Sequence, residues 1–270
     1  MIFLTLMFSV FREAVAKKIF LGFFAIATLI ILFFLLLVNV DSVEGMVNMM
    51  EATGEEGVKQ LVMGFQVGMI TISYFLVITF CFIAVSSFIP SMLEKGNVDI
   101  LLSKPVSRTN IILAKFLGGV LLIFLSLTYM IGGVWLILSV KSGFWHFPFL
   151  LSIPWLTFSF AVIYALIILI GVTTQSTILS IIVSMFLVFV ICPVLFVRET
   201  VIFSFITNST MQFVINFFYY ILPKLNDINK IIEEIIMGNS VSSYMPAVSS
   251  SMFMLAALLL SIFYFRRKDY

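Results

Sequence analysis

The sequence has very little charge for its length. Only 10% of its 270 residues are Asp, Glu, Lys or Arg, whereas 62% are hydrophobic. Soluble globular domains contain about 25% charged and about 45–50% apolar residues. One soluble core cannot hide this much apolar surface, so lipid must solvate much of the chain. No long basic block occurs either, and we therefore expect no nucleic acid among its partners.

The residues that carry most catalytic and metal chemistry are also scarce. The single histidine, His146, excludes a His-Glu-x-x-His zinc site, and no Gly-Lys pair is present to form a P-loop. Cys81 and Cys192 lie in the middle of apolar runs, which indicates two buried thiols acting as small hydrophobic groups. We expect no catalytic residue, no metal site, no cofactor and no ATPase site in this chain. His146 is expected in an interfacial loop, with a ligand role as the alternative.

Long uncharged runs are abundant. A membrane helix needs about 20 mostly apolar residues. The runs predict an all-α integral membrane protein, organised as one domain over residues 1–270 with about six transmembrane helices. The expected spans cover about residues 19–40, 61–92, 116–140, 149–170, 178–197 and 247–265.

The distribution of basic residues predicts the orientation. Cytoplasmic loops carry an excess of Lys and Arg. With six spans and the N-terminus inside, ten of the fifteen basic residues fall on the cytoplasmic side, and both termini are cytoplasmic. These ten are Arg12, Lys17, Lys18, Lys95, Lys104, Arg108, Lys115, Arg266, Arg267 and Lys268.

One further uncharged run, residues 200–222, lies in the expected outer segment 198–246. A seventh span there would place the tail Arg266–Lys268 outside, and the middle of the run, residues 207–210, is polar. We therefore interpret it as a re-entrant or interfacial segment, with a further span as the alternative.

Two amphipathic helices are expected outside the spans. Within residues 1–18, polar and apolar side chains follow opposite sides of a helix, which indicates a helix in the inner membrane interface. A long first span that starts early is the alternative. Near residues 227–237, five isoleucines repeat with helical spacing. Asn226 or Asp227 is expected to cap that outer helix, and Gly238 to end it.

The segment 94–115 is the most informative part of the chain. Gly96 permits a sharp change of direction, and Pro105 prevents one smooth helix. Between them, Leu101 and Leu102 belong to a short apolar helix, and Ser107 can cap the helix that rises into the third span. Such a helix is either a docking handle for a cytoplasmic partner or part of a basic loop anchored to lipid headgroups.

This segment closely resembles the loop of bacterial type-2 (ABC-2) exporter permeases. In that family a Glu-x-Gly-x-x-x-x-Leu-Leu-Ser-x-Pro-x-Ser-Arg run precedes a lysine and a glycine. The matching residues and those beside them are Glu94, Gly96, Asp99, Leu101, Leu102, Lys104, Pro105, Ser107, Arg108, Lys115, Gly118 and Gly119. Detailed matching is confined to about residues 92–119, whereas the likeness in architecture covers the whole chain.

The resemblance implies a function. It suggests a half-size permease without a fused ATPase, in the inner (plasma) membrane of a prokaryote. Such permeases form homodimers or pair with a sister permease, and two separate ATPase subunits bind ATP-Mg. The short helix at 94–108 would be a coupling helix that docks into the ATPase, and the first and fifth spans would form the dimer contact. Ser180 and Ser184 offer a small-residue face in the fifth span for that contact.

The chain is also similar in topology to the permease associated with nitrous oxide reductase maturation, although this likeness indicates no substrate. Two other functions stay open. A stand-alone secondary transporter is disfavoured, because the apolar cores of the spans contain no carboxylate. An ATPase-coupled membrane scaffold or sensor could use the same loop.

Overall fold

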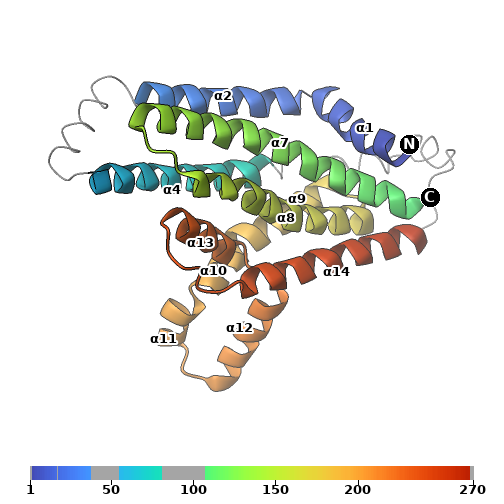
Figure 1. Ribbon diagram of the computed structural model, residues 1–270. Helices are drawn as coiled ribbons and strands as arrows, with labels where there is room; N and C mark the ends of the chain where they lie inside the picture. The colour runs from blue at the N-terminus through green and yellow to red at the C-terminus, as the bar shows by residue number, and fades with distance from the viewer. Residues whose placement is uncertain (1, 17, 38–54, 81–106, 268–270) are drawn as a thin grey trace.

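The computed structural model describes residues 2–16, 18–37, 55–80 and 107–267. These residues form helices joined by turns, with no strand among them (Figure 1). The prediction of an all-α membrane protein is therefore confirmed.

Helices in the first half of the chain are long. In chain order they are α1 (Ile2–Ala16), α2 (Ile19–Leu37), α4 (Glu55–Phe80) and α7 (Arg108–Ser142). A short 3-10 helix, η2 (Phe147–Leu151), then leads into α8 (Ser152–Thr174). The turn after α8 is confined to Gln175, which has a φ of 54°, and Ser176, which caps the next helix by accepting a hydrogen bond from the Leu179 amide.

The second half of the chain is more broken. It comprises α9 (Thr177–Phe186), a π-helical turn η3 (Leu187–Ile191), α10 (Cys192–Phe196), a second π-helical turn η4 (Arg198–Ile202), α11 (Phe203–Phe205), α12 (Ser209–Ile221), α13 (Leu225–Ile236) and α14 (Met245–Arg267). Pro193 explains the first π-helical turn, since it cannot donate to the turn before it and the ladder must widen there.

Four stretches among the described residues are long and apolar enough to cross a membrane. They are Arg108–Ser142, Phe147–Thr174, Thr177–Phe196 and Met245–Arg267. A shorter apolar helix covers Leu21–Leu36. Because α4 ends at Phe80, where the description stops, the expected span 61–92 lies partly outside the described residues.

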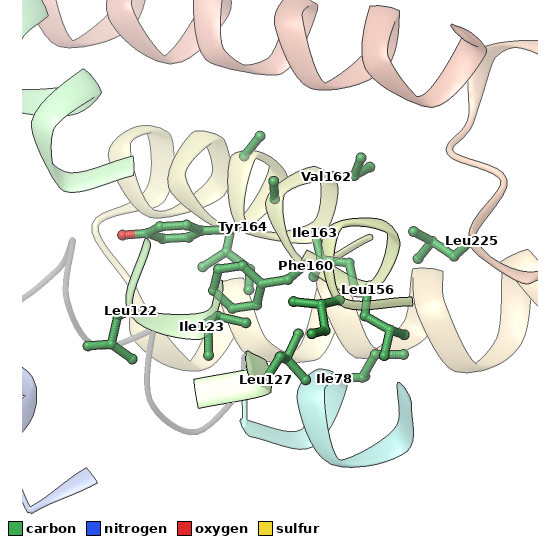
Figure 2. Packing of buried hydrophobic residues seen from close by; sticks show 14 of the residues in the cluster. Ile78, Leu122, Ile123, Leu127, Leu156, Phe160, Val162, Ile163, Tyr164 and Leu225 are labelled. Carbon is green, nitrogen blue, oxygen red and sulfur yellow. The ribbon is translucent and has the colours of Figure 1, made fainter. Parts of the chain in front are cut away.

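Helix α8 forms the centre of the bundle. Inside the molecule, 78% of its apolar stretch is buried, against 28% for the stretches of α9–α10 and of α14. Figure 2 shows Phe160, Ile163 and Tyr164 of α8 beside Leu122 and Leu127 of α7, with Ile78 of α4 on the same core. The outer helices α9 and α14 therefore present most of their apolar surface to the surroundings.

The small-residue face of the fifth span lies inside the protomer. Ser180 and Ser184 are both fully buried, and α9 packs on α8. The small-residue face is therefore used inside the protomer, where it lets two helices approach closely. The prediction that it faces a second permease is wrong.

Helix α1 is separate from α2. The helix is interrupted at Lys18, whose φ of 56° is left-handed, so a single long first span is excluded. Val10 of α1 is fully buried, and Met7 and Phe11 are half-buried, because this side of α1 packs on α7. The apolar face thus contacts protein. Figure 1 shows α1 and the end of α14 at the same end of the bundle.

The segment 200–222 forms a helical hairpin that projects from the side of the bundle (Figure 1). Its turn follows Ile206, and Asn208 caps α12 by accepting from the Thr210 amide at 2.9 Å. With 13 residues, α12 is about 20 Å long and too short to span the hydrocarbon core. The alternative of a seventh span is therefore wrong.

Helix α13 corresponds to the amphipathic helix expected near residues 227–237. Leu225, Ile228, Ile231, Ile232 and Ile236 are buried, because α13 packs on α4, η2, α8 and α10. Gly238 ends it as predicted, with a φ of 70° and paired hydrogen bonds from Gly238 and Asn239 to the last turn. The predicted cap is wrong. The helix starts at Leu225, and no side chain caps it.

Candidate functional site at the base of α7

Most of the predicted coupling residues cannot be placed. Glu94, Gly96, Asp99, Leu101, Leu102, Lys104 and Pro105 lie outside the described residues. Ser107, Arg108 and Lys115 are described, and all three lie at the N-terminal end of α7. We call this end, together with the parts of α1, α8 and α14 that contact it, the junction.

Ser107 fixes the point at which the loop becomes a helix. Its backbone is extended, and its hydroxyl accepts a hydrogen bond from the Asn110 amide at 3.2 Å. This satisfies one of the free amides in the first turn. The predicted cap is therefore confirmed, and α7 begins well before the expected span at 116.

Arg108 joins the start of α7 to the end of α14. One guanidinium nitrogen donates to the carbonyl oxygens of Phe265 at 3.1 Å and of Arg266 at 3.3 Å. Carbonyls in the last turn of a helix have no partner within the helix, so a cation placed there both satisfies and neutralises them. The first residue of α7 thus binds the last turn of α14.

Lys115 joins α7 to α1. Its side chain is buried, and its ammonium group lies 2.6 Å from the Glu13 carboxylate. Glu13 keeps 23% of its side-chain surface exposed. A charge buried in this way needs a partner of opposite sign, because desolvation would otherwise cost several kcal/mol. Helix α1 is therefore tied by a charge pair to the first part of α7.

Two glycines allow the surrounding helices to approach α7 closely. A Cβ on Gly118 would lie 2.8 Å from Val10 Cγ2 and 2.9 Å from the Met7 carbonyl oxygen of α1. A Cβ on Gly119 would lie 2.4 Å from the ring of Tyr164 of α8. All three distances are too short for a Cβ atom to fit without a shift of its neighbours. Adjacent glycines therefore bring α1 and α8 against the same turn.

Tyr164 completes the junction. Its hydroxyl donates to the Lys115 carbonyl at 3.1 Å, and its ring stacks on Phe116 with a centroid distance of 5.7 Å. Phe160 covers the ring from its own helix, 5.5 Å away. Within about three turns, from Arg108 to Gly119, α7 thus contacts α1, α8 and α14 through an ion pair, glycine contacts and hydrogen bonds. The arrangement suits the transfer of movement and supplies no bond chemistry.

Sequence reasoning missed the partners of these residues. Glu13 lies in the expected interfacial helix 1–18, and Tyr164 lies in the expected span 149–170. Lys115 itself was a possible signal. An ammonium group that is buried next to an expected span needs a carboxylate partner on another helix. Nothing in the sequence selected Glu13 for this role.

A second polar cluster lies at the opposite end of the bundle and was also missed. Arg198 is buried, donates to Asn216 and Glu199, and stacks on Tyr219 with its guanidinium carbon 3.3 Å from the ring centroid. Lys224 is buried as well and lies 4.6 Å from the same ring. Asp227 accepts from the Tyr219 hydroxyl. This cluster holds α12 and α13 to the bundle.

His146 is more buried than expected. It is 8% exposed, and its Nδ1 lies 2.7 Å from Gln66 Oε1 of α4. Burial lowers its pKa below the usual value of 6.5. His146 lies in the loop between α7 and η2, as expected, but its side chain packs against α4 and is not left exposed. Cys192 is buried, as expected, and Cys81 lies outside the described residues. In the part of the chain that is described, no group of three His, Cys, Asp or Glu side chains could hold a metal ion.

Comparison with known proteins identifies the family. The family model of the ABC-2 family transporter proteins matches residues 9–270, which include the described junction as well as the loop before it. A search of the curated proteins found no match. Since the family model covers nearly the whole chain, this protein belongs to the ABC-2 family of transporter proteins and is a multi-pass membrane component of an ABC transporter.

Proposed function

We propose that the chain is the permease subunit of an ATP-driven exporter whose ATPase is a separate protein. The family supports a membrane transport subunit, and the chain contains no Gly-Lys pair for a P-loop. ATP-Mg would therefore be bound and hydrolysed by the partner, and this chain would hold no cofactor. The substrate is unidentified, and the similarity to the nitrous oxide reductase maturation permease does not supply one.

The observation that carries this proposal is the junction. The loop 94–106 leads directly into Ser107 and Arg108, and from there α7 binds α14, α1 and α8 through Arg108, Lys115 and Gly119. A displacement of this segment by the ATPase would thus act on α1, α8 and α14 at once. With 35 residues, α7 is about 50 Å long, so a displacement at its base would reach the outer end.

In this mechanism, Leu101 and Leu102 dock in a groove of the ATPase. Glu94, Lys95 and Asp99 disfavour their insertion in the membrane, and burying each leucine in a partner is worth about 1.5–3 kcal/mol. Glu94 and Arg108 orient the short helix or meet charges on the ATPase. Gly96 and Pro105 set its two ends. This end of the bundle, which carries both termini, would face the cytoplasm of a prokaryotic cell.

A dimer of permeases is part of the proposal. Residues of α2 and α9 on the outside of the bundle are apolar and exposed, which supports the first and fifth spans as the contact. In α9 they are Ile178, Leu179, Ile182, Val183, Met185 and Phe186. The second subunit would be a copy of this chain or a sister permease.

The experiment replaces both leucines, Leu101→Asp with Leu102→Asp, in the complex purified from its native membrane. We expect normal insertion of the permease, loss of the P-loop ATPase from the complex, and loss of ATP-driven transport. Leu101→Met with Leu102→Met is the matched control and should retain both. Lys104→Gln tests the lipid-anchor alternative and should have little effect. Full ATPase binding and full transport in the double Asp variant would refute the coupling role.

A further inference from the structure

The lipid-facing side of α14 ends in a charged groove. A hollow of about 480 Å³ runs along one face of the last three turns. It is lined by Leu259, Ile262, Phe263, Arg266 and Arg267. The spacing of these residues, i, i+3, i+4, i+7 and i+8, places them on one side of the helix. The groove is therefore apolar toward the middle of the membrane and cationic at its edge.

The apolar half is open to lipid. Leu259 is 67% exposed and Phe263 is 48% exposed. Only 28% of the apolar stretch of α14 is buried within the molecule. Because α14 is a candidate membrane span, its exposed side chains are covered by acyl chains wherever protein does not cover them.

The charged half has an ordered geometry. Arg267 lies over the ring of Phe263, with 4.3 Å between its guanidinium carbon and the ring centroid. Arg266 is the preceding residue, and both arginine side chains are exposed. Between Met245 and Arg267 the helix contains no Asp or Glu that could neutralise them. Two guanidinium groups therefore face the level of the lipid headgroups.

Arg108 removes the main obstacle to an anion at this place. The C-terminal end of a helix carries a partial negative charge on its free carbonyls, which disfavours anions. Here the Phe265 and Arg266 carbonyls accept hydrogen bonds from Arg108. This contact brings a third cation to the end of α14 and covers the oxygens that would repel a phosphate.

We propose that this groove binds an anionic glycerophospholipid, with its phosphate between Arg266 and Arg267 and one acyl chain along Leu259 and Phe263. Charge complementarity selects the headgroup, since arginine binds phosphate in a forked geometry. The apolar half selects a lipid over a free phosphate. A lipid bound here would hold the end of α14 in the headgroup region beside the junction.

The test is native mass spectrometry of the purified permease in an uncharged detergent. Titration with phosphatidylglycerol and with phosphatidylcholine should show preferential binding of phosphatidylglycerol. Arg266→Gln with Arg267→Gln should weaken phosphatidylglycerol binding about tenfold, since each basic residue near the surface contributes separately. The matched control, Lys141→Gln with Lys230→Gln, removes two exposed cations away from the groove and should leave binding unchanged.

Two further variants keep the charge and therefore the insertion of the helix. Arg266→Lys with Arg267→Lys should weaken the binding less than the double Gln variant does, because lysine keeps the charge and loses the forked geometry. Phe263→Ala should weaken the binding several-fold. Millimolar inorganic phosphate should not displace the lipid. Equal binding of both lipids, equal loss in the control pair, or unchanged binding in Phe263→Ala would overturn the proposal. So would loss of the ATPase in the double Gln variant with lipid binding intact, because the arginines would then serve a protein contact.

Discussion

At the residue scale, Gly118 and Gly119 of α7 allow close contacts that a larger side chain would prevent. The Tyr164 ring is held between Phe116 and Phe160 and by its hydrogen bond to Lys115, so it cannot move away from a larger side chain at 119. Gly132, on the same helix, has nothing within 4 Å of its ideal Cβ. Alanine substitutions at Gly119 and at Gly132 therefore distinguish two effects on stability: the steric cost of a close contact and the gain in helix propensity.

Gly119→Ala should therefore destabilise the protein by about 1–3 kcal/mol, the usual cost of overpacking. Gly132→Ala should be neutral or stabilise by up to about 1 kcal/mol, because alanine favours helix more than glycine. Unfolding of both variants in detergent, followed by circular dichroism, measures the difference. Equal stability of the two would show that the Tyr164 contact at Gly119 is not as close as described.

His146 gives a pH prediction. Burial lowers its pKa in the folded protein, so between the two pKa values the unfolded chain binds more protons. Stability should be fully present above the unfolded pKa of about 6.5 and fall as the pH drops from there through the folded pKa. Thermal unfolding at pH 7.5 and pH 5.5 would measure the loss. His146→Gln, which keeps a polar side chain opposite Gln66, should lessen that dependence, and a variant with the same dependence as the parent would exclude His146 as its source.

At the element scale, the position of a helix in the sequence depends mainly on its own residues, whereas the face that it buries depends on the other helices. Apolar runs predicted the regions of α2, α7, α8, α9–α10 and α14, because a membrane helix depends mainly on the composition of its own segment. The Ser107 cap and the Gly238 end were also predictable, since each depends on residues nearby in sequence. The direction in which each helix faces depends on the rest of the fold. For this reason the burial of Ser180, Ser184 and His146 inside the protomer was not predicted, and the Lys115–Glu13 pair was missed.

Helix α13 shows the same limit and offers a test. Its isoleucine face was predictable, whereas the surface that covers that face was not. Ile232 is fully buried against protein, so Ile232→Ala should destabilise by about 2–4 kcal/mol through the cavity it leaves. The neighbouring Glu233 is exposed, and Glu233→Ala should change stability by less than about 0.5 kcal/mol. If α13 merely lay on lipid, both variants would unfold at the same denaturant concentration as the parent.

At the scale of the whole molecule, the ends of the bundle have different constructions. One end of the bundle carries α1 and the last turns of α14. The junction, the start of α7 and the basic groove all lie at this end. The other end is closed by α13 and by the Arg198, Tyr219 and Lys224 cluster. Helices α7 and α8 run between the two and form most of the core. In the proposed function, such a body would transmit a movement from the start of α7 to the other end of the bundle.

The central claim is that the loop before α7 binds a separate ATPase. The most direct measurement is photo-crosslinking from a benzoylphenylalanine placed at position 101 in cells that express the intact transporter. We expect one major adduct between this chain and a P-loop ATPase, and no adduct from the same probe at Lys230 on α13. A probe at 101 that labels only lipid, or that labels the ATPase no more than the probe at 230, would contradict the account.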